Sequence, residues 1–345
     1  MRKASPSDVW INLENIPRIL WPSTLSPPGS MALRAEEPRI LFGMSVLVIF
    51  NPISGAGRAR GIADQVAAAG RERGLDLELL PTSPGFQTDS WLREPLQGRD
   101  ALVVVGGDGA VRLVAPEAAR AGVPLLHCPA GNENLFAREF GMRPDPEVVA
   151  DTLDRGEIRH VDLVRVEVEG RPEETVVLMA SFGLDAEVVH DLSARRTGSV
   201  NNWSYVGPTL RQWWRFDPCP ISVTVDGEIV ARDTRGLVVI ANSRQYAIRL
   251  DLAAEAKMDD GLIDLVILPC RSRLGMLAWF LRCFRGTHQR HPRSIHLTGR
   301  RIELQTSQAT RWQVDGDPPH APAAVTKIAF EVMPGALPVL VPPGS

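Results

Sequence analysis

Several features are scarce or absent in this sequence of 345 residues, and each absence excludes a class of protein. The formal net charge of −3 provides no basic surface for nucleic acid, so we expect no nucleic-acid partner. The four cysteines show no CxxC or Cys/His metal spacing, which favours a reduced, cytoplasmic protein. They are Cys128, Cys219, Cys270 and Cys283.

Long apolar runs are also missing. The longest, at 41–50 and 274–284, are far shorter than the roughly 18 apolar residues that cross a bilayer. Residues 1–43 hold several prolines and lack the basic start and apolar centre of a signal peptide. We therefore expect 1–43 to be a disordered extension, or the product of an early start with Met31 or Met44 as the true initiator.

From Met44 onward, apolar strands alternate with stretches of helical spacing. The run MSVLVIF at 44–50 is typical of a strand buried on both faces. A helix is expected over 62–74, strands over 75–80 and 101–105, a helix up to about 121, and a further strand, turn and helix over 124–141. This alternation predicts an α/β domain with a parallel sheet over 44–157.

Beyond about residue 158 the pattern becomes mainly β. Alternating segments and turn pairs such as Asp226-Gly227 predict antiparallel hairpins, most simply a β-sandwich over 158–318. Strands are expected over 162–170, 174–183, 221–233, 236–243, 262–268, 294–299, 301–306 and 311–317. Two helical stretches, 185–215 with Trp203, Trp213 and Trp214, and 274–286, either pack their aromatics inward or contact a membrane surface.

Glycine-bearing turns fall where the predicted strands of the first domain end: NPISG at 51–55, TSPG at 82–85, GGDG at 106–109 and PAGNEN at 129–134. The carboxyl ends of parallel strands share one sheet edge, where ligands bind, and backbone N–H groups at such turns suit phosphates. Neither a Walker A loop nor a GxGxxG fingerprint is present. GGDG alone is also compatible with a plain tight turn, but a carboxylate beside phosphates favours a cation or a proton transfer there.

Six motifs, in order and spacing, resemble the diacylglycerol kinase catalytic-domain family: NPISG, VVVGGDGA, PAGNENLFAREFG, SFGLDAEV, MDDGLIDLVIL and VDGD. The sequence is most similar to the soluble bacterial lipid kinases of that family, and it also resembles the sphingosine kinases and, more distantly, the NAD kinases. The resemblance covers about Met44 to Pro342. It implies an α/β nucleotide-binding domain at 44–157, to which 319–342 returns, a β-sandwich at 158–318, and an active cleft between them.

The resemblance also implies roles for individual residues. Asp317 of VDGD matches a glutamate that is the proposed general base; the alternative for VDGD is a solvated type I′ turn. Asp108 matches the essential aspartate of GGDG, whose role in the family is Mg-nucleotide binding or, in the sphingosine kinases, base catalysis. Lys257, Asp260 and Leu262 match a Mg²⁺ loop, whose alternative is a hairpin turn with solvated aspartates. The positions that match nucleotide contacts are Asn51, Ser54, Gly55, Thr82, Gly106, Gly107, Asp108, Gly109, Ala110, Gly131, Asn132 and Asn134.

Several positions depart from the family pattern. Ala110 replaces a phosphate-binding threonine, Leu113 a glutamate and Leu135 an acid, and the 243–250 loop has lost its glycines. Either a water or Arg112 is expected to fill the space beside Ala110.

We expect an ATP- and Mg²⁺-dependent kinase for diacylglycerol or a similar amphiphile. The alternatives are a catalytically impaired nucleotide- or lipid-binding member and a kinase for a soluble acceptor such as NAD. Contact with the inner membrane surface and a homodimer remain open.

Overall fold

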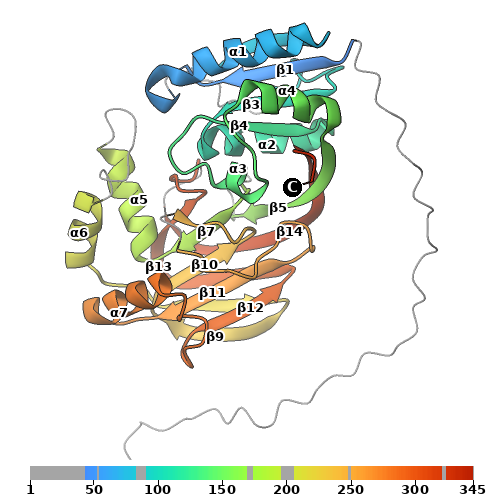
Figure 1. The fold of residues 1–345 in the computed structure, drawn as a ribbon. Coiled ribbons are helices and arrows are strands. Elements are labelled where there is room, and N and C mark those ends of the chain that lie inside the picture. The colour runs from blue at the N-terminus through green and yellow to red at the C-terminus, as the bar shows by residue number, and fades with distance from the viewer. Residues whose placement is uncertain are drawn as a thin grey trace, which may run out of the picture. The chain divides into compact units, whose positions relative to one another are not determined.

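The computed structural model describes residues 43–52, 54–82, 91–168, 174–195, 206–247, 250–320 and 324–344 (Figure 1). The extension predicted at 1–43 lies outside this part of the chain apart from Gly43. So do most of the TSPG turn and Trp203.

The first half of the described chain is a parallel α/β layer. Its strands are β1 (Ser45–Phe50), β2 (Asp76–Pro81), β3 (Ala101–Gly106) and β4 (Leu125–Pro129). They pair in parallel in the order β2-β1-β3-β4. Every residue of β3 and β4 is buried, as the continuous apolar runs predict.

Helices connect and cover these strands (Figure 1). They are the short 3₁₀ helix η2 (Ser54–Gly57), then α1 (Arg58–Glu72), α2 (Asp108–Ala121), α3 (Leu135–Glu139) and α4 (Pro146–Arg155). Helix α1 begins earlier than the expected residue 62. Helix α4 was not predicted, although Asp145 caps it by accepting a hydrogen bond from Glu147 N–H at 2.9 Å and Pro146 stands at its first turn.

The second half is mainly antiparallel. Its strands are β5 (Glu157–Glu167), β6 (Glu174–Val176), β7 (Met179–Phe182), β8 (Ile221–Val225), β9 (Glu228–Thr234), β10 (Gly236–Ala241), β11 (Ile263–Pro269), β12 (Ile295–Gly299), β13 (Arg301–Val314) and β14 (Ala324–Val341). The hairpin predicted at Asp226-Gly227 joins β8 to β9, with φ angles of 48° and 86°.

Two sheet layers enclose the sandwich core, and β13 connects them because it belongs to both layers. Its segment 302–306 pairs with β8, whereas 312–314 pairs with β7, and a register shift separates the two parts. The predicted strands 301–306 and 311–317 are therefore one strand. The segment 174–183, predicted as one strand, is divided into β6 and β7. Trp312 lies in the core against Phe182 and Phe330.

Strand β14 joins the two halves. Its residues 324–331 pair with β13, residues 329–333 and 337–341 pair with β5, and Val339 pairs in parallel with Leu125 of β4. The return to the α/β layer is thus made by the end of β14. The exact domain limits at 157/158 and 318/319 stay a prediction.

Three helices lie on the β-rich half: α5 (Leu184–Ala194), α6 (Val206–Trp214) and α7 (Arg273–Phe284). The first two replace the single helical stretch expected over 185–215. Within the described residues, no helix has both the length and the apolar character needed to cross a membrane.

Candidate functional site

Three of the glycine turns meet at the carboxyl ends of β1, β3 and β4. A β-carbon added to Gly55, which has a φ of 59°, would stand 2.4 Å from the carbonyl oxygen of Ala130. A β-carbon on Gly131 would stand 2.7 Å from the Cα of Gly107. Side chains are therefore excluded where the turns touch, which explains why the sequence has glycine there.

Asp108 ties two of these turns together. Its Oδ2 accepts a hydrogen bond from Leu135 N–H at 2.9 Å, and its Oδ1 accepts one from Phe136 N–H at 3.0 Å. Both donors belong to the first turn of α3, whose N–H groups have no partner within their own helix. The aspartate that opens α2 thus fixes the position of α3, and each of its oxygens already has a donor.

Asn134 closes the third turn. It adopts a φ of 48°, its Oδ1 accepts from Gly131 N–H at 2.9 Å, and its Nδ2 donates to Gly131 O at 2.9 Å. Asn132 is exposed on the same turn. Of the other predicted contacts, Ser54 N–H donates to Asn51 O at 3.0 Å and Thr82 N–H donates to Phe50 O at 2.8 Å.

His127 supports the GGDG turn from β4 and was not predicted. Its side chain is fully buried, and its Nε2 lies 2.9 Å from Gly106 O. Burial lowers the pKa of His127, against the opposing effects of that carbonyl and of the Asp108 charge. A neutral imidazole that donates from Nε2 fits this contact.

Asp317 comes from the distant VDGD turn and lies beside GGDG. Its Oδ2 would stand 3.2 Å from a β-carbon on Gly109, so glycine leaves room for the carboxylate. Asp315 and Gly316 have φ angles of 49° and 83°, as in a type I′ turn. The alternative of a solvated turn is wrong in one respect, because Asp315 is buried.

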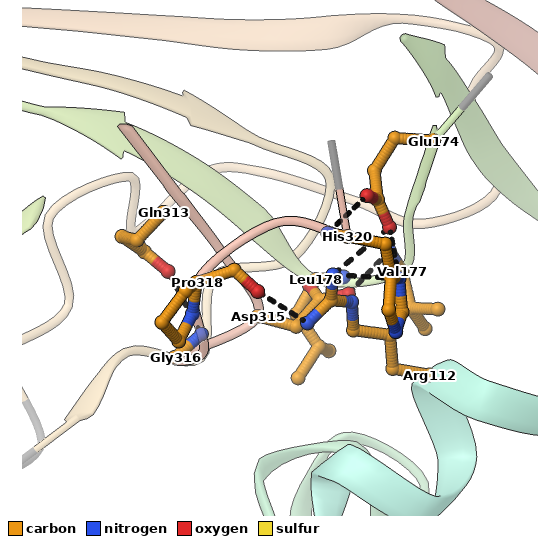
Figure 2. A network of polar contacts seen from close by, with 9 residues as sticks. All are labelled: Arg112, Glu174, Val177, Leu178, Gln313, Asp315, Gly316, Pro318 and His320. Carbon is orange, nitrogen blue, oxygen red and sulfur yellow. Dashed lines mark hydrogen bonds and ion pairs between the residues drawn. The ribbon is translucent and has the colours of Figure 1, made fainter. Parts of the chain in front are cut away.

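Asp315 anchors the VDGD turn to the start of β7. Its carboxylate accepts hydrogen bonds from the N–H groups of Val177, Leu178 and Met179 at 3.0, 2.7 and 2.9 Å. Burial raises the pKa of Asp315 to about 6, although the charge of Arg112 and the three donors oppose the rise. Gln313 Oε1 accepts from Gly316 N–H at 2.8 Å and holds the other side of the turn (Figure 2).

Arg112 of α2 joins the same network (Figure 2). Its Nη2 donates to Glu174 Oε1 at 2.9 Å, and both side chains are only 6% exposed. Its Nη1 lies 3.5 Å from Pro318 O, and His320 N–H donates to Glu174 Oε2 at 2.8 Å. Burial opposes ionisation of Glu174, but the hydrogen bond from His320 and the charge of Arg112 outweigh it and lower the pKa of Glu174 to about 2. The guanidinium of Arg112 is thus engaged with Glu174 and the 318–320 segment, so it does not fill the space beside Ala110.

The predicted metal loop is a tight turn before β11. Gly261 has a φ of 72°, and Asp260 Oδ1 accepts from Leu262 N–H at 3.0 Å. Asp162, at 2% exposure, accepts from Gly261 N–H and Gly335 N–H, both at 2.7 Å. Lys257 is exposed at the beginning of the loop. Sequence reasoning missed Asp162, which reads as an ordinary strand residue.

A cavity of about 250 Å³ adjoins the turns. Its walls come from the N-terminus of α1, the 129–134 turn and α3, and they include Arg58, Gly131, Asn134 and Arg138. Leu135 faces the apolar core and Leu113 packs against it, where the family pattern has acids. Residues 248 and 249 of the altered loop lie outside the described chain.

The parallel layer with its glycine turns, followed by the β-sandwich, has the fold of the NAD kinase and diacylglycerol kinase class. A solved structure titled as a diacylglycerol kinase from Bacillus anthracis str. Sterne superposes with a TM-score of 0.64 at 21% identity, covering 87% of this chain and 98% of that one. The model of the diacylglycerol kinase catalytic domain matches residues 45–166. The model of the YegS C-terminal NAD kinase beta sandwich-like domain matches residues 178–341.

Two relatives agree with these matches. The chain is 31% identical over 247 residues to a diacylglycerol kinase of Mycobacterium tuberculosis strain H37Rv, covering 70% of this chain and 79% of the relative. It is 25% identical over 281 residues to a diacylglycerol kinase of Bacillus subtilis strain 168, covering 78% and 88%. The chain belongs to the diacylglycerol kinase catalytic-domain family, and this membership supports a kinase of the lipid-kinase type.

Proposed function

We propose that this protein transfers the γ-phosphoryl group of ATP to a hydroxyl of diacylglycerol or a similar amphiphile. The observation that supports it best is the position of Asp317, whose Oδ2 would stand 3.2 Å from a β-carbon on Gly109 of the GGDG turn. A carboxylate supplied by the sandwich half thereby adjoins the glycine turns of the α/β half. The names of the relatives supply the acceptor class.

In this proposal, the glycine turns hold the phosphates. Gly55, Gly107, Gly109 and Gly131 leave these turns without side chains where a phosphate would approach, and α2 begins at Asp108 with its positive dipole end toward them. Arg58 in the adjoining cavity adds positive charge, whereas Arg138 is paired with Glu133 of the same cavity at 3.9 Å. Such positioning and charge neutralisation supply most of the catalysis in phosphoryl transfer.

Asp317 and Asp108 have different roles in this scheme. Among the described residues, none donates a hydrogen bond to the carboxylate of Asp317. This carboxylate is therefore free to take the proton of the acceptor hydroxyl, while the hydroxyl oxygen bonds to the γ-phosphorus and ADP leaves. Asp108 already accepts two N–H donors from α3. We assign Asp108 to positioning the turns and Asp317 to the proton transfer.

The loop at 257–262 fits an oxygen-ligated cation. Burial, followed by the charges of Asp260 and Glu255, raises the pKa of Asp264 to about 6, and a cation beside Asp260 would relieve the repulsion between these carboxylates. Asp260, with the carbonyls of Lys257 and Leu262, would hold Mg²⁺. The ion would supply local charge neutralisation and a fixed loop.

The test is phosphate transfer by the purified chain, with Mg-ATP and either diacylglycerol in mixed micelles or NAD as the acceptor. We expect transfer to diacylglycerol, a loss of about 10² to 10⁴ in kcat for Asp317→Asn, and retained activity for Asp317→Glu, which has the family's side chain. Asp108→Asn should lower both activity and melting temperature, because an amide oxygen can accept only part of what the carboxylate accepts. Equal transfer by wild type and Asp317→Asn on every acceptor would sink the proposal.

A second candidate is a catalytically impaired binding protein. Three observations favour it: Ala110 has no hydroxyl for phosphate, Leu135 is buried in the apolar core and Leu113 packs against that core. It predicts that ATP raises the melting temperature without any transfer. Measurable turnover on any acceptor excludes it.

A further inference from the structure

Helix α7 has an apolar outer face as well as an apolar inner face. Met276, Trp279 and Cys283 point inward and are at most 8% exposed, and Trp279 Nε1 donates to Pro269 O at 2.7 Å. The outer residues recur at the same helical spacing and are exposed by 76%, 44%, 46%, 42% and 70%. They are Leu274, Leu277, Phe280, Leu281 and Phe284. A surface helix normally presents polar residues to water, so this face is unusual.

Helix α6 extends the apolar face. Val206, Leu210 and Trp214 follow one another at four-residue spacing and are exposed by 47%, 54% and 62%. Trp213 Nε1 donates to Arg273 O at 3.2 Å, and the guanidinium of Arg273 lies 5.2 Å from the Trp214 ring centroid. The two helices therefore contact each other, and Figure 1 shows both of them beside the strands of the β-rich half. We call these eight exposed side chains the α6–α7 patch.

The segment that carries α7 is rich in arginine. Between residues 271 and 294 the sequence has six arginines and no acidic residue, in a chain whose net charge is −3. All six arginines are exposed, and in the described parts of the chain none forms an ion pair. They are Arg271, Arg273, Arg282, Arg285, Arg290 and Arg293. Elsewhere, exposed arginines such as Arg155 and Arg195 lie beside acids.

We infer that the α6–α7 patch docks the protein on an anionic lipid bilayer. Leucine and phenylalanine enter the headgroup and acyl boundary, tryptophan lies at the interface, and arginines contact the anionic headgroups. The complementarity between this acid-free, arginine-rich segment and an anionic surface selects this occupant over a second copy of the chain, because two such segments would repel each other. The inference goes beyond phosphoryl transfer, but it gives the proposed lipid kinase a route to acceptors that lie in a membrane.

The test is sedimentation of the full chain with sucrose-loaded vesicles of phosphatidylcholine alone or mixed with phosphatidylglycerol. We expect binding to the anionic vesicles that weakens with salt, and much weaker binding to the neutral ones. Leu274→Ser with Phe284→Ser, and separately Arg282→Glu with Arg285→Glu, should each lower the partition coefficient at least about tenfold. Controls away from the patch, Ile158→Ser and Arg93→Glu, should bind as wild type does.

Two further measurements separate the possible failures. Melting temperatures establish that the exposed substitutions leave the fold intact. Phosphate transfer to a short-chain diacylglycerol below its aggregation concentration should not change in the patch variants, so a failed docking surface and a failed kinase assignment give different results. Equal binding of neutral and anionic vesicles, or patch variants that bind like wild type, would contradict the inference. A wild-type dimer that Leu274→Ser with Phe284→Ser dissociates would assign the patch to a second copy and overturn it.

Discussion

Ala110 lies in the first turn of α2, directly against the glycine turn. Its β-carbon is 2.7 Å from the position that a β-carbon on Gly106 would take, and its N–H donates to Gly107 O at 2.9 Å. A threonine here would carry its hydroxyl at the mouth of the turn, where the family pattern has one. Arg112 does not compensate, because its guanidinium is held by Glu174.

We therefore predict that Ala110→Thr lowers the KM for ATP. A regained hydroxyl-to-phosphate hydrogen bond contributes about 0.5 to 1.5 kcal/mol, which corresponds to roughly two- to tenfold. Initial rates at varied ATP and saturating acceptor measure the effect. Ala110→Val is the matched control, because it adds the same bulk without a hydroxyl. If both variants change KM equally, the hydroxyl has no role and crowding against Gly106 explains the result.

At the scale of single residues, the sequence predicts a site residue well when the requirement is local. Gly55, Gly107 and Gly131 were found because each belongs to a short turn motif after an apolar strand. Arg112 and Asp162 are different, because their partners Glu174 and Gly261 are 62 and 99 residues away. Nothing near Asp162 distinguishes it from other polar residues of an alternating strand. The fold alone creates these contacts.

Among the elements, α2 and β6 are held together by a buried ion pair. Arg112 and Glu174 are each 6% exposed, and Glu174 also accepts from His320. Removing one partner of a buried pair costs about 3 to 5 kcal/mol, because the other charge stays in a low-dielectric environment. We therefore expect Arg112→Met to lower the free energy of unfolding at pH 7 by about 3 kcal/mol. It should also loosen the 315–320 segment.

The pH dependence of this loss has a defined sign. In wild type the pKa of Glu174 is lowered to about 2, so its contribution is present above the unfolded pKa of roughly 4.3 and is lost as pH falls toward 2. In Arg112→Met, Glu174 lacks the arginine charge and protonates at higher pH. The difference between the two proteins should therefore shrink between about pH 5 and pH 2, as measured by urea unfolding. Arg60→Met, on α1 and in a pair with Asp64 that is exposed on both sides, should cost less than about 0.5 kcal/mol at either pH.

Element types were predictable from periodicity, whereas element limits were not. β13 reads as two strands because Ser307 to Thr310 interrupts the alternation, yet a register shift lets one strand pass through the interruption. Helix α4 was missed although Asp145, Pro146 and the apolar spacing of Val149 and Leu153 are ordinary signals of a helix start. In the first case tertiary pairing overrides the local pattern. In the second, the local signal was sufficient and was overlooked.

At the scale of the whole described chain, Asp162 connects three segments. It lies in β5, its Oδ2 accepts from Gly261 of the predicted metal loop, and its Oδ1 accepts from Gly335 in the middle of β14. Since β5 and β14 run through both halves, the loop at 257–262 is linked to the strands that join them. Burial raises the pKa of Asp162, the two N–H donors lower it, and the charges of Asp260 and Asp259 raise it again. A cation at this loop would offset that repulsion and hold the junction together.

We therefore predict that Mg²⁺ stabilises the whole protein through Asp260, independently of ATP. At a Mg²⁺ concentration a hundred times its Kd, binding to the folded state adds about 2.7 kcal/mol. The wild-type melting temperature should rise along a saturable Mg²⁺ titration without nucleotide and fall back on addition of a chelator. Asp260→Ala should abolish the titration, whereas Asp259→Ala, an exposed neighbour, should keep it. If wild type melts at one temperature in Mg²⁺ and in chelator, or if Asp260→Ala responds as wild type does, the loop is a hairpin turn with solvated aspartates and the junction depends on Asp162 alone.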